Sequence, residues 1–65
     1  MEIQNIDTID FEEHGDGGHG VLIIRKCGEQ VAICLSLEEN GDNEALIDKE
    51  VAERLIKALE NAVGR

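Results

Sequence analysis

The stretch best suited to chemistry is residues 12–20, with the sequence EEHGDGGHG. His14, Asp16 and His19 offer two imidazoles and a carboxylate, a ligand combination suited to zinc, nickel or copper. The four glycines make the stretch flexible, and loop ligands without supporting contacts bind metal weakly. A simpler interpretation is a connection between two strands, because glycine supplies the positive φ that such turns need. We therefore predict that residues 12–20 only connect two strands and that the protein holds no cofactor. A metal site at His14, Asp16 and His19 is the alternative.

Phosphate binding and catalysis are both disfavoured by the surrounding residues. Phosphate loops lead into a helix N-terminus and usually carry a lysine, but residues 1–24 contain neither lysine nor arginine. The thiols of Cys27 and Cys34 have no basic neighbourhood in the sequence apart from Lys26. The acids lie in turns with no apolar cleft to change their ionisation. We expect this protein not to be an enzyme.

The elements that position these residues must fit into one small domain, residues 1–65. A chain of this length buries only about 60% of its unfolded surface, which makes stability marginal without oligomerisation, metal or disulfides. Phe11 is the only aromatic residue, so the core must be aliphatic. No apolar run has the length of a signal peptide or a membrane span. We expect a cytoplasmic protein with reduced thiols.

The net charge of −9, from 15 acids and 6 bases, narrows the possible partners. Direct nucleic-acid binding is disfavoured because lysine and arginine carry the affinity for phosphate. Anionic membrane surfaces are disfavoured for the same reason. A basic surface on another protein remains compatible with this charge.

The clearest element is a helix over residues 49–63. Its apolar positions follow one stripe at helical period. Asp48 occupies the N-cap position and Gly64 follows the last apolar residue. Pairs of an acid and a base four residues apart, such as Glu50 with Arg54, add a few tenths of a kcal/mol each.

Strands are predicted before this helix. Residues 31–37 alternate between apolar and small or polar side chains, and residues 21–24 are rich in branched side chains. The tight turn between them centres on either Cys27-Gly28 or Gly28-Glu29. Both registers put the same apolar residues on one face: Leu22 and Ile24 with Val31, Ile33 and Leu35.

A second hairpin is predicted at Asn40-Gly41, the strongest short hairpin signal. Centring the turn there pairs Leu35 with Leu46 and Cys34 with Ile47, in a short strand over residues 44–47. A weaker pattern of Ile3, Ile6, Ile9 and Phe11 indicates one further strand. The fold class is therefore α+β: a small antiparallel β-meander of three to four strands, with one C-terminal α-helix packed on one face.

The meander brings the first connection and the Asn40-Gly41 turn to the same end of the sheet. Acids gather there, whereas Arg25 and Lys26 mark the other end. This acidic end is a candidate protein-binding site, or only a solubilising surface. Its predicted members are Glu12, Glu13, Asp16, Glu38, Glu39, Asp42 and Glu44.

The face of the sheet away from the helix is predicted to be apolar. Exposed apolar patches usually mark an interface, and self-association would stabilise so short a chain. We expect a homodimer formed through this face. Its predicted members are Val21, Ile23, Ala32, Cys34 and Ile47, with Ala45 beside them.

Three functions are consistent with these features. The first is a small acidic, homodimeric module that binds another protein or regulates it. The second is an acidic inhibitor of the phage type, which mimics nucleic acid and blocks a nucleic-acid-binding protein. The third is a metal-binding protein that uses His14, Asp16 and His19.

Overall fold

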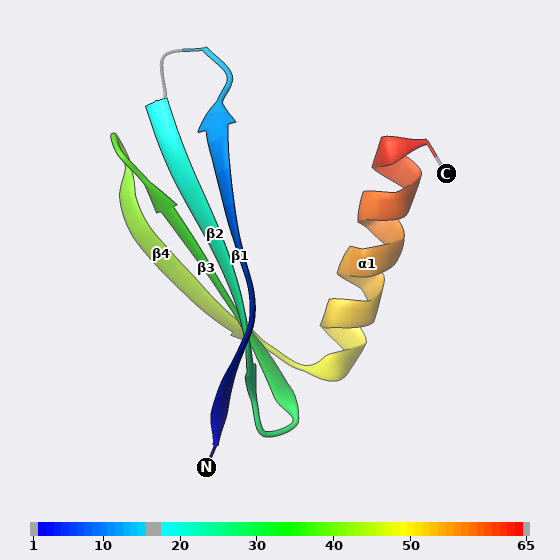
Figure 1. Ribbon diagram of the computed structural model, residues 1–65. Coiled ribbons are helices and arrows are strands. Elements are labelled where there is room, and N and C mark those ends of the chain that lie inside the picture. Colours follow the sequence, from blue (N-terminus) through cyan, green and yellow to red (C-terminus); the bar gives the residue numbers. More distant parts are fainter. Residues whose placement is uncertain (1, 16–17, 65) are drawn as a thin grey trace.

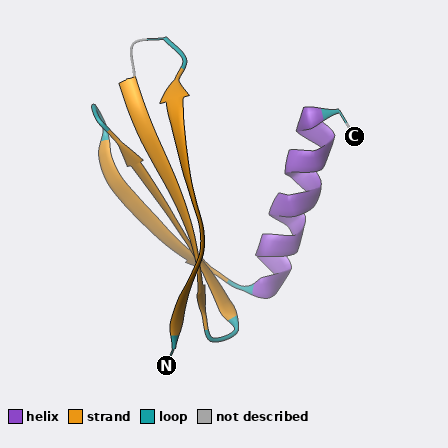
Figure 2. Ribbon diagram, viewed as in Figure 1, coloured by secondary structure: helices purple, strands orange, loops and turns teal. Residues whose placement is uncertain are grey.

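The computed structural model describes residues 2–15 and 18–64 (Figure 1). Four antiparallel strands form one sheet in the order β1-β2-β3-β4, and a helix follows the last strand (Figure 2). The predicted fold class, an α+β meander with a single C-terminal helix, is confirmed. The elements are β1 (Ile3–Glu13), β2 (Gly18–Cys27), β3 (Gln30–Leu37), β4 (Gly41–Ile47) and α1 (Lys49–Val63).

α1 begins and ends at its predicted caps. The Asp48 carboxylate accepts a hydrogen bond from the backbone N–H of Val51 at 2.9 Å, which satisfies a donor of the first turn. Gly64 ends the helix with φ +96°, a left-handed conformation that glycine adopts without strain. At 15 residues α1 is short, and the described part of the chain holds no helix long and apolar enough to cross a bilayer.

The turn between β2 and β3 is Gly28-Glu29, the second of the two predicted centres, since Cys27 pairs with Gln30. Gly28 has φ +63° and Glu29 has no positive φ, as in a type II′ turn. The predicted facing across this hairpin is confirmed by two pairs, Leu22 with Leu35 and Ile24 with Ile33.

The predicted register between β3 and β4 is wrong. Leu35 pairs with Asn43 and Cys34 with Glu44, because the turn contains three residues, 38–40, and Gly41 already pairs with Leu37. Gly41 has φ +79° whereas Asn40 has no positive φ. The left-handed residue therefore follows the three-residue turn, whereas a two-residue Asn-Gly turn would need a positive φ at both Asn40 and Gly41.

This shift of three residues exchanges the two faces of β4, because side chains alternate with a period of two. Leu46 pairs with Ala32 on the face away from the helix, where Ile47 was predicted. Ile47 pairs with Val31 and lies on the helix side together with Ala45. Ile47 and Ala45 are therefore removed from the predicted apolar patch, and Leu46 joins it.

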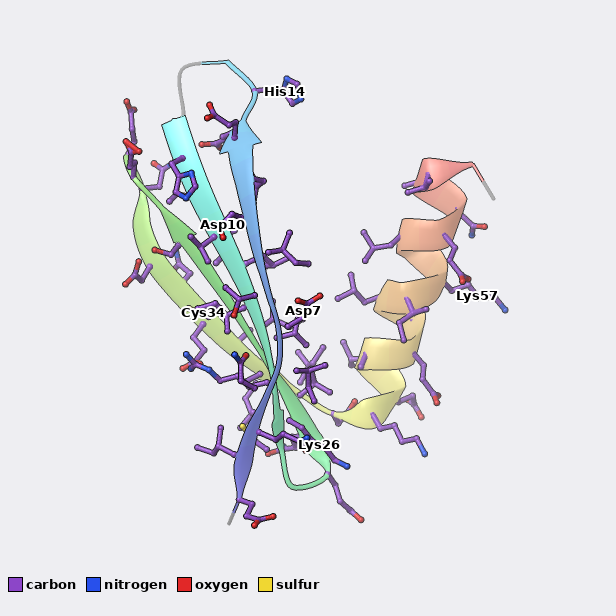
Figure 3. All side chains as sticks on the ribbon, viewed as in Figure 1. Asp7, Asp10, His14, Lys26, Cys34 and Lys57 are labelled. Carbon is purple, nitrogen blue, oxygen red and sulfur yellow. The ribbon has the colours of Figure 1, made fainter. Side chains whose placement is uncertain are left out.

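A bulge in β1 changes the facing of the first strand. Asn5 pairs with Arg25 but Asp7 pairs with Ile24, so Ile6 is an extra residue in β1. After the bulge the odd-numbered residues of β1 lie on the helix side. Figure 3 shows Asp7 on this side of the sheet, facing α1.

α1 lies on one side of the sheet but diverges from it (Figure 1). Within the described chain α1 contacts mainly β3, and no described residue of α1 is buried. Full burial of a Val, Leu or Ile side chain stabilises a fold by about 1.5–3 kcal/mol. Most of that stabilisation is unrealised in the single chain, because the apolar stripe of α1 stays exposed, namely Val51, Leu55, Ile56, Leu59 and Val63.

Candidate functional site

The face of the sheet turned away from α1, here called the open face, combines the two surfaces predicted separately. Strand pairing defines rows of side chains that cross it from β1 to β4. In each of the first two rows an acid occupies the β4 edge and an apolar residue the centre. The rows are Asp10–Val21–Ser36–Asp42, Thr8–Ile23–Cys34–Glu44 and Asn5–Arg25–Ala32–Leu46.

The centre of the open face is apolar and only partly covered. Ala32 is 4% exposed, because the longer side chains of the neighbouring strands surround its methyl group. Val21, Ile23 and Cys34 are half-buried. These four members of the predicted dimer patch do share one face, and Leu46, 55% exposed, adds to it at the β4 edge.

Acids line both edges of this apolar centre. Asp10 and Glu12 lie on β1, and Asp42 and Glu44 lie on β4. The two edges are three strand spacings apart, about 14 Å. The open face thus has an apolar centre between two acidic edges.

The acids on β4 are oriented by neighbours on the adjacent strands. The Ser36 hydroxyl donates a hydrogen bond to the Asp42 carboxylate. Arg25 Nη1 lies 3.4 Å from Glu44 Oε2, an exposed ion pair of at most about 1 kcal/mol. Arg25 was predicted to mark the opposite end of the sheet, but its guanidinium reaches back to this acidic edge.

Hydrogen bonds between Glu38 and His19 join the β3–β4 turn to the start of β2, at the end of the sheet where the first connection lies. The backbone N–H of Glu38 donates to the carbonyl oxygen of His19, and the Glu38 carboxylate accepts from the His19 N–H, both at 3.2 Å. The predicted co-location of the first connection and the β3–β4 turn is therefore confirmed. His19 Nε2 also lies 3.1 Å from Asp10 Oδ1, a pairing that the sequence did not indicate.

Three of the seven predicted acids, Glu13, Glu38 and Glu39, lie outside the rows of the open face. Glu39 lies in the turn between β3 and β4. Glu13 pairs with Gly18 on the helix side, and its Oε2 is buried without a hydrogen-bond partner among the described residues. Asp16 lies outside the described residues. Asp10, which was not predicted, belongs to the open face with Glu12, Asp42 and Glu44, whereas Glu38 lies in the turn beside Glu39.

The metal site proposed from the sequence has two ligands in the described part of the chain, His14 and His19. No group of three potential ligands comes together among residues 2–15 and 18–64. The imidazole of His19 contacts Asp10, and Figure 3 shows His14 at the outer end of the sheet. Cys27 and Cys34 are both free thiols.

Comparisons of the chain with family models, with curated proteins and with solved structures found no match.

Proposed function

We propose that this protein is a non-enzymatic module that binds a basic surface of another protein through its open face. The observation that carries the proposal is the apolar centre between two acidic edges. Protein interfaces commonly combine an apolar centre, which supplies binding energy, with a polar rim, which supplies orientation and specificity. The free thiols of Cys27 and Cys34 fit an activity in the cytoplasm, where thiols stay reduced.

Charge would select the partner of this surface. Four acids along two edges speed association with a basic surface and disfavour acidic surfaces, while adding little to affinity individually. A second copy of this chain would bring like charges together at both edges. The open face therefore suits a basic partner better than the homodimer predicted from the sequence.

A second candidate is an inhibitor that mimics nucleic acid. The two acidic edges lie about 14 Å apart, which is close to the width of the major groove of B-DNA, about 12 Å. Two parallel lines of negative charge at this spacing suit a protein surface that holds the two strands of a duplex. On this alternative the partner is a nucleic-acid-binding protein, and wild-type protein displaces its DNA or RNA.

The proposal is tested by capture of partners with two variants of equal net charge. One variant neutralises the open face with Asp10→Asn, Glu12→Gln and Asp42→Asn, which keep an oxygen acceptor for His19 and Ser36. The control neutralises three distant exposed acids with Glu2→Gln, Glu53→Gln and Glu60→Gln. A basic partner should be captured by wild type and control but lost with the first variant.

Equal capture by all three proteins would contradict the proposal, because the acids of the open face would then only solubilise the chain. For the second candidate, the captured protein is loaded with its DNA or RNA and titrated with wild type. Retention of the nucleic acid would exclude mimicry while leaving the protein-binding proposal intact.

A further inference from the structure

A groove with a volume of about 1290 Å³ lies between α1 and the sheet. Both of its walls are apolar. The sheet contributes Ile6, Ile24 and Ile33, and the helix contributes Leu55, Ile56 and Leu59. Figure 3 shows Lys57 on the outer side of α1, directed away from the sheet. No residue among 2–15 and 18–64 fills the groove.

The exposed surface of the chain is larger than its mass predicts. It measures 5336 Å², whereas a compact monomer of 7.1 kDa exposes about 4,100 Å². The radius of gyration is 13.0 Å, against about 11 Å for a compact domain of this length. The excess of about 1,200 Å² exceeds the roughly 800 Å² that each partner buries in a standard stable interface.

The connection before α1 opposes closure of the helix onto its own sheet. Asp48 is the only residue between β4 and α1. Its backbone is extended (φ −83°, ψ 174°) while its carboxylate caps the first turn. Rotating the helix toward the sheet about ψ of Asp48 would move the Val51 N–H away from the Asp48 carboxylate and weaken this cap.

We infer that a second copy of this chain fills the groove, so that each copy inserts its α1 between the sheet and the helix of the other. The two apolar walls of the groove are a helix stripe and a sheet face. A two-fold axis pairs both surfaces of both copies at once and leaves no apolar wall open. A foreign ligand would have to supply both a helix stripe and a sheet face to do the same.

The charge distribution permits this dimer despite the net charge of −9 per chain. The acids of the open face, Asp10, Glu12, Asp42 and Glu44, point away from the groove, whereas Asp7 and Glu13 on β1 lie on the helix side. The charged residues that line the groove cluster where α1 leaves β4 and at the β2–β3 turn, and they include both signs, as in Lys26, Lys49, Glu50 and Glu53. Binding of a basic partner to the open face and dimerisation through the groove would therefore use opposite faces of the sheet.

The test compares two substitutions of the same chemistry at two leucines of equal exposure. Leu59 in the groove is 56% exposed and Leu46 on the open face is 55% exposed. Size exclusion with light scattering should give wild type and Leu46→Asp about twice the chain mass at about 100 µM, and Leu59→Asp the chain mass. The helical circular dichroism of Leu59→Asp reports whether that variant still folds.

A second measurement does not depend on any variant. Isotope-filtered NMR on a mixture of labelled and unlabelled chains should show contacts between the Leu59 methyl groups of one chain and the Ile24 or Ile33 methyl groups of the other. A wild-type monomer at this concentration would overturn the inference, whether its groove is open or closed by its own helix. A dimer broken by Leu46→Asp but not by Leu59→Asp would overturn it in favour of the open face. The capture experiment changes only acids outside the apolar walls of the groove. A negative result for partner binding through the open face therefore does not contradict dimerisation through the groove, and the reverse also holds.

Discussion

Phe11 packs its aromatic ring directly over Gly20, its cross-strand partner on β2. A Cβ atom on Gly20 would lie 2.7 Å from Phe11 Cε2 and 3.0 Å from Leu37 Cδ2, so only glycine leaves room for the ring. An aromatic side chain that covers a glycine on the neighbouring strand fixes the register of the pair. The last glycine of EEHGDGGHG is thus required by packing of the only aromatic residue.

Gly20→Ala should destabilise the fold by about 1–3 kcal/mol, because the methyl group forces the Phe11 ring and Leu37 to move. Urea unfolding at fixed protein concentration measures the change. The same substitution in a Phe11→Leu background should cost much less, so in a double-mutant cycle the double variant should lose less stability than the sum of the two single losses. Equal costs in both backgrounds would contradict this account of Gly20.

Asp48→Ala should destabilise the protein by about 1 kcal/mol, because the backbone N–H of Val51 loses its side-chain acceptor. Asp48→Asn is the matched control, since its amide oxygen can still accept the bond. Thermal unfolding followed by circular dichroism compares the three proteins. Unchanged stability of Asp48→Ala would show that water replaces the cap at no cost.

The elements of this fold were predictable where the signal is local. The stripe and caps of α1 depend on neighbouring residues, and residues 49–63 are helical as predicted. The β3–β4 register depends on where the chain reverses. Ala45, Leu46 and Ile47 are consecutive apolar residues, so their pattern specifies no face, and the length of the turn decides.

The candidate site was predicted in part for the same reasons. Placing the acids at one end needed only the order of the turns, whereas placing them on the open face needed the bulge at Ile6 and the register of β4. The three-residue spacing of Ile3, Ile6 and Ile9 breaks the strand period of two, and could have indicated the bulge. Amphipathicity predicted the apolar stripe of α1, but the expected packing of this stripe on the sheet is slight in the single chain, where the stripe stays exposed.

Replacing His14 and His19 together by Ala should leave the melting temperature almost unchanged, with or without zinc. His19 loses only its exposed contact with Asp10, which is worth less than about 1 kcal/mol. His14→Ala alone keeps the contact between His19 and Asp10, so its comparison with the double variant isolates the effect of losing that contact. A zinc-dependent rise of several degrees in wild type, lost in the double variant, would favour the metal-binding alternative. Differential scanning calorimetry with zinc and with a chelator makes the comparison.

Neutralising the open face should weaken binding of a basic ligand and reduce the salt dependence of that binding. An arginine-rich peptide serves as the probe, and NMR titration reports both affinity and location. Wild type should show amide shifts on β1 and β4 around Asp10 and Asp42, with little change along α1. The variant with Asp10→Asn, Glu12→Gln and Asp42→Asn should bind about five- to thirtyfold more weakly, since each exposed charge contact contributes at most about 1 kcal/mol.

The control for this titration is the variant with Glu2→Gln, Glu53→Gln and Glu60→Gln, whose net charge changes by the same amount. If net charge alone attracted the peptide, both variants would weaken equally, and the shifts would spread over the whole surface. If the open face is the site, the control should bind as wild type does at moderate salt, because charges beyond about 10 Å are screened there. Equal weakening of the two variants would therefore reduce the acids of the open face to a solubilising role.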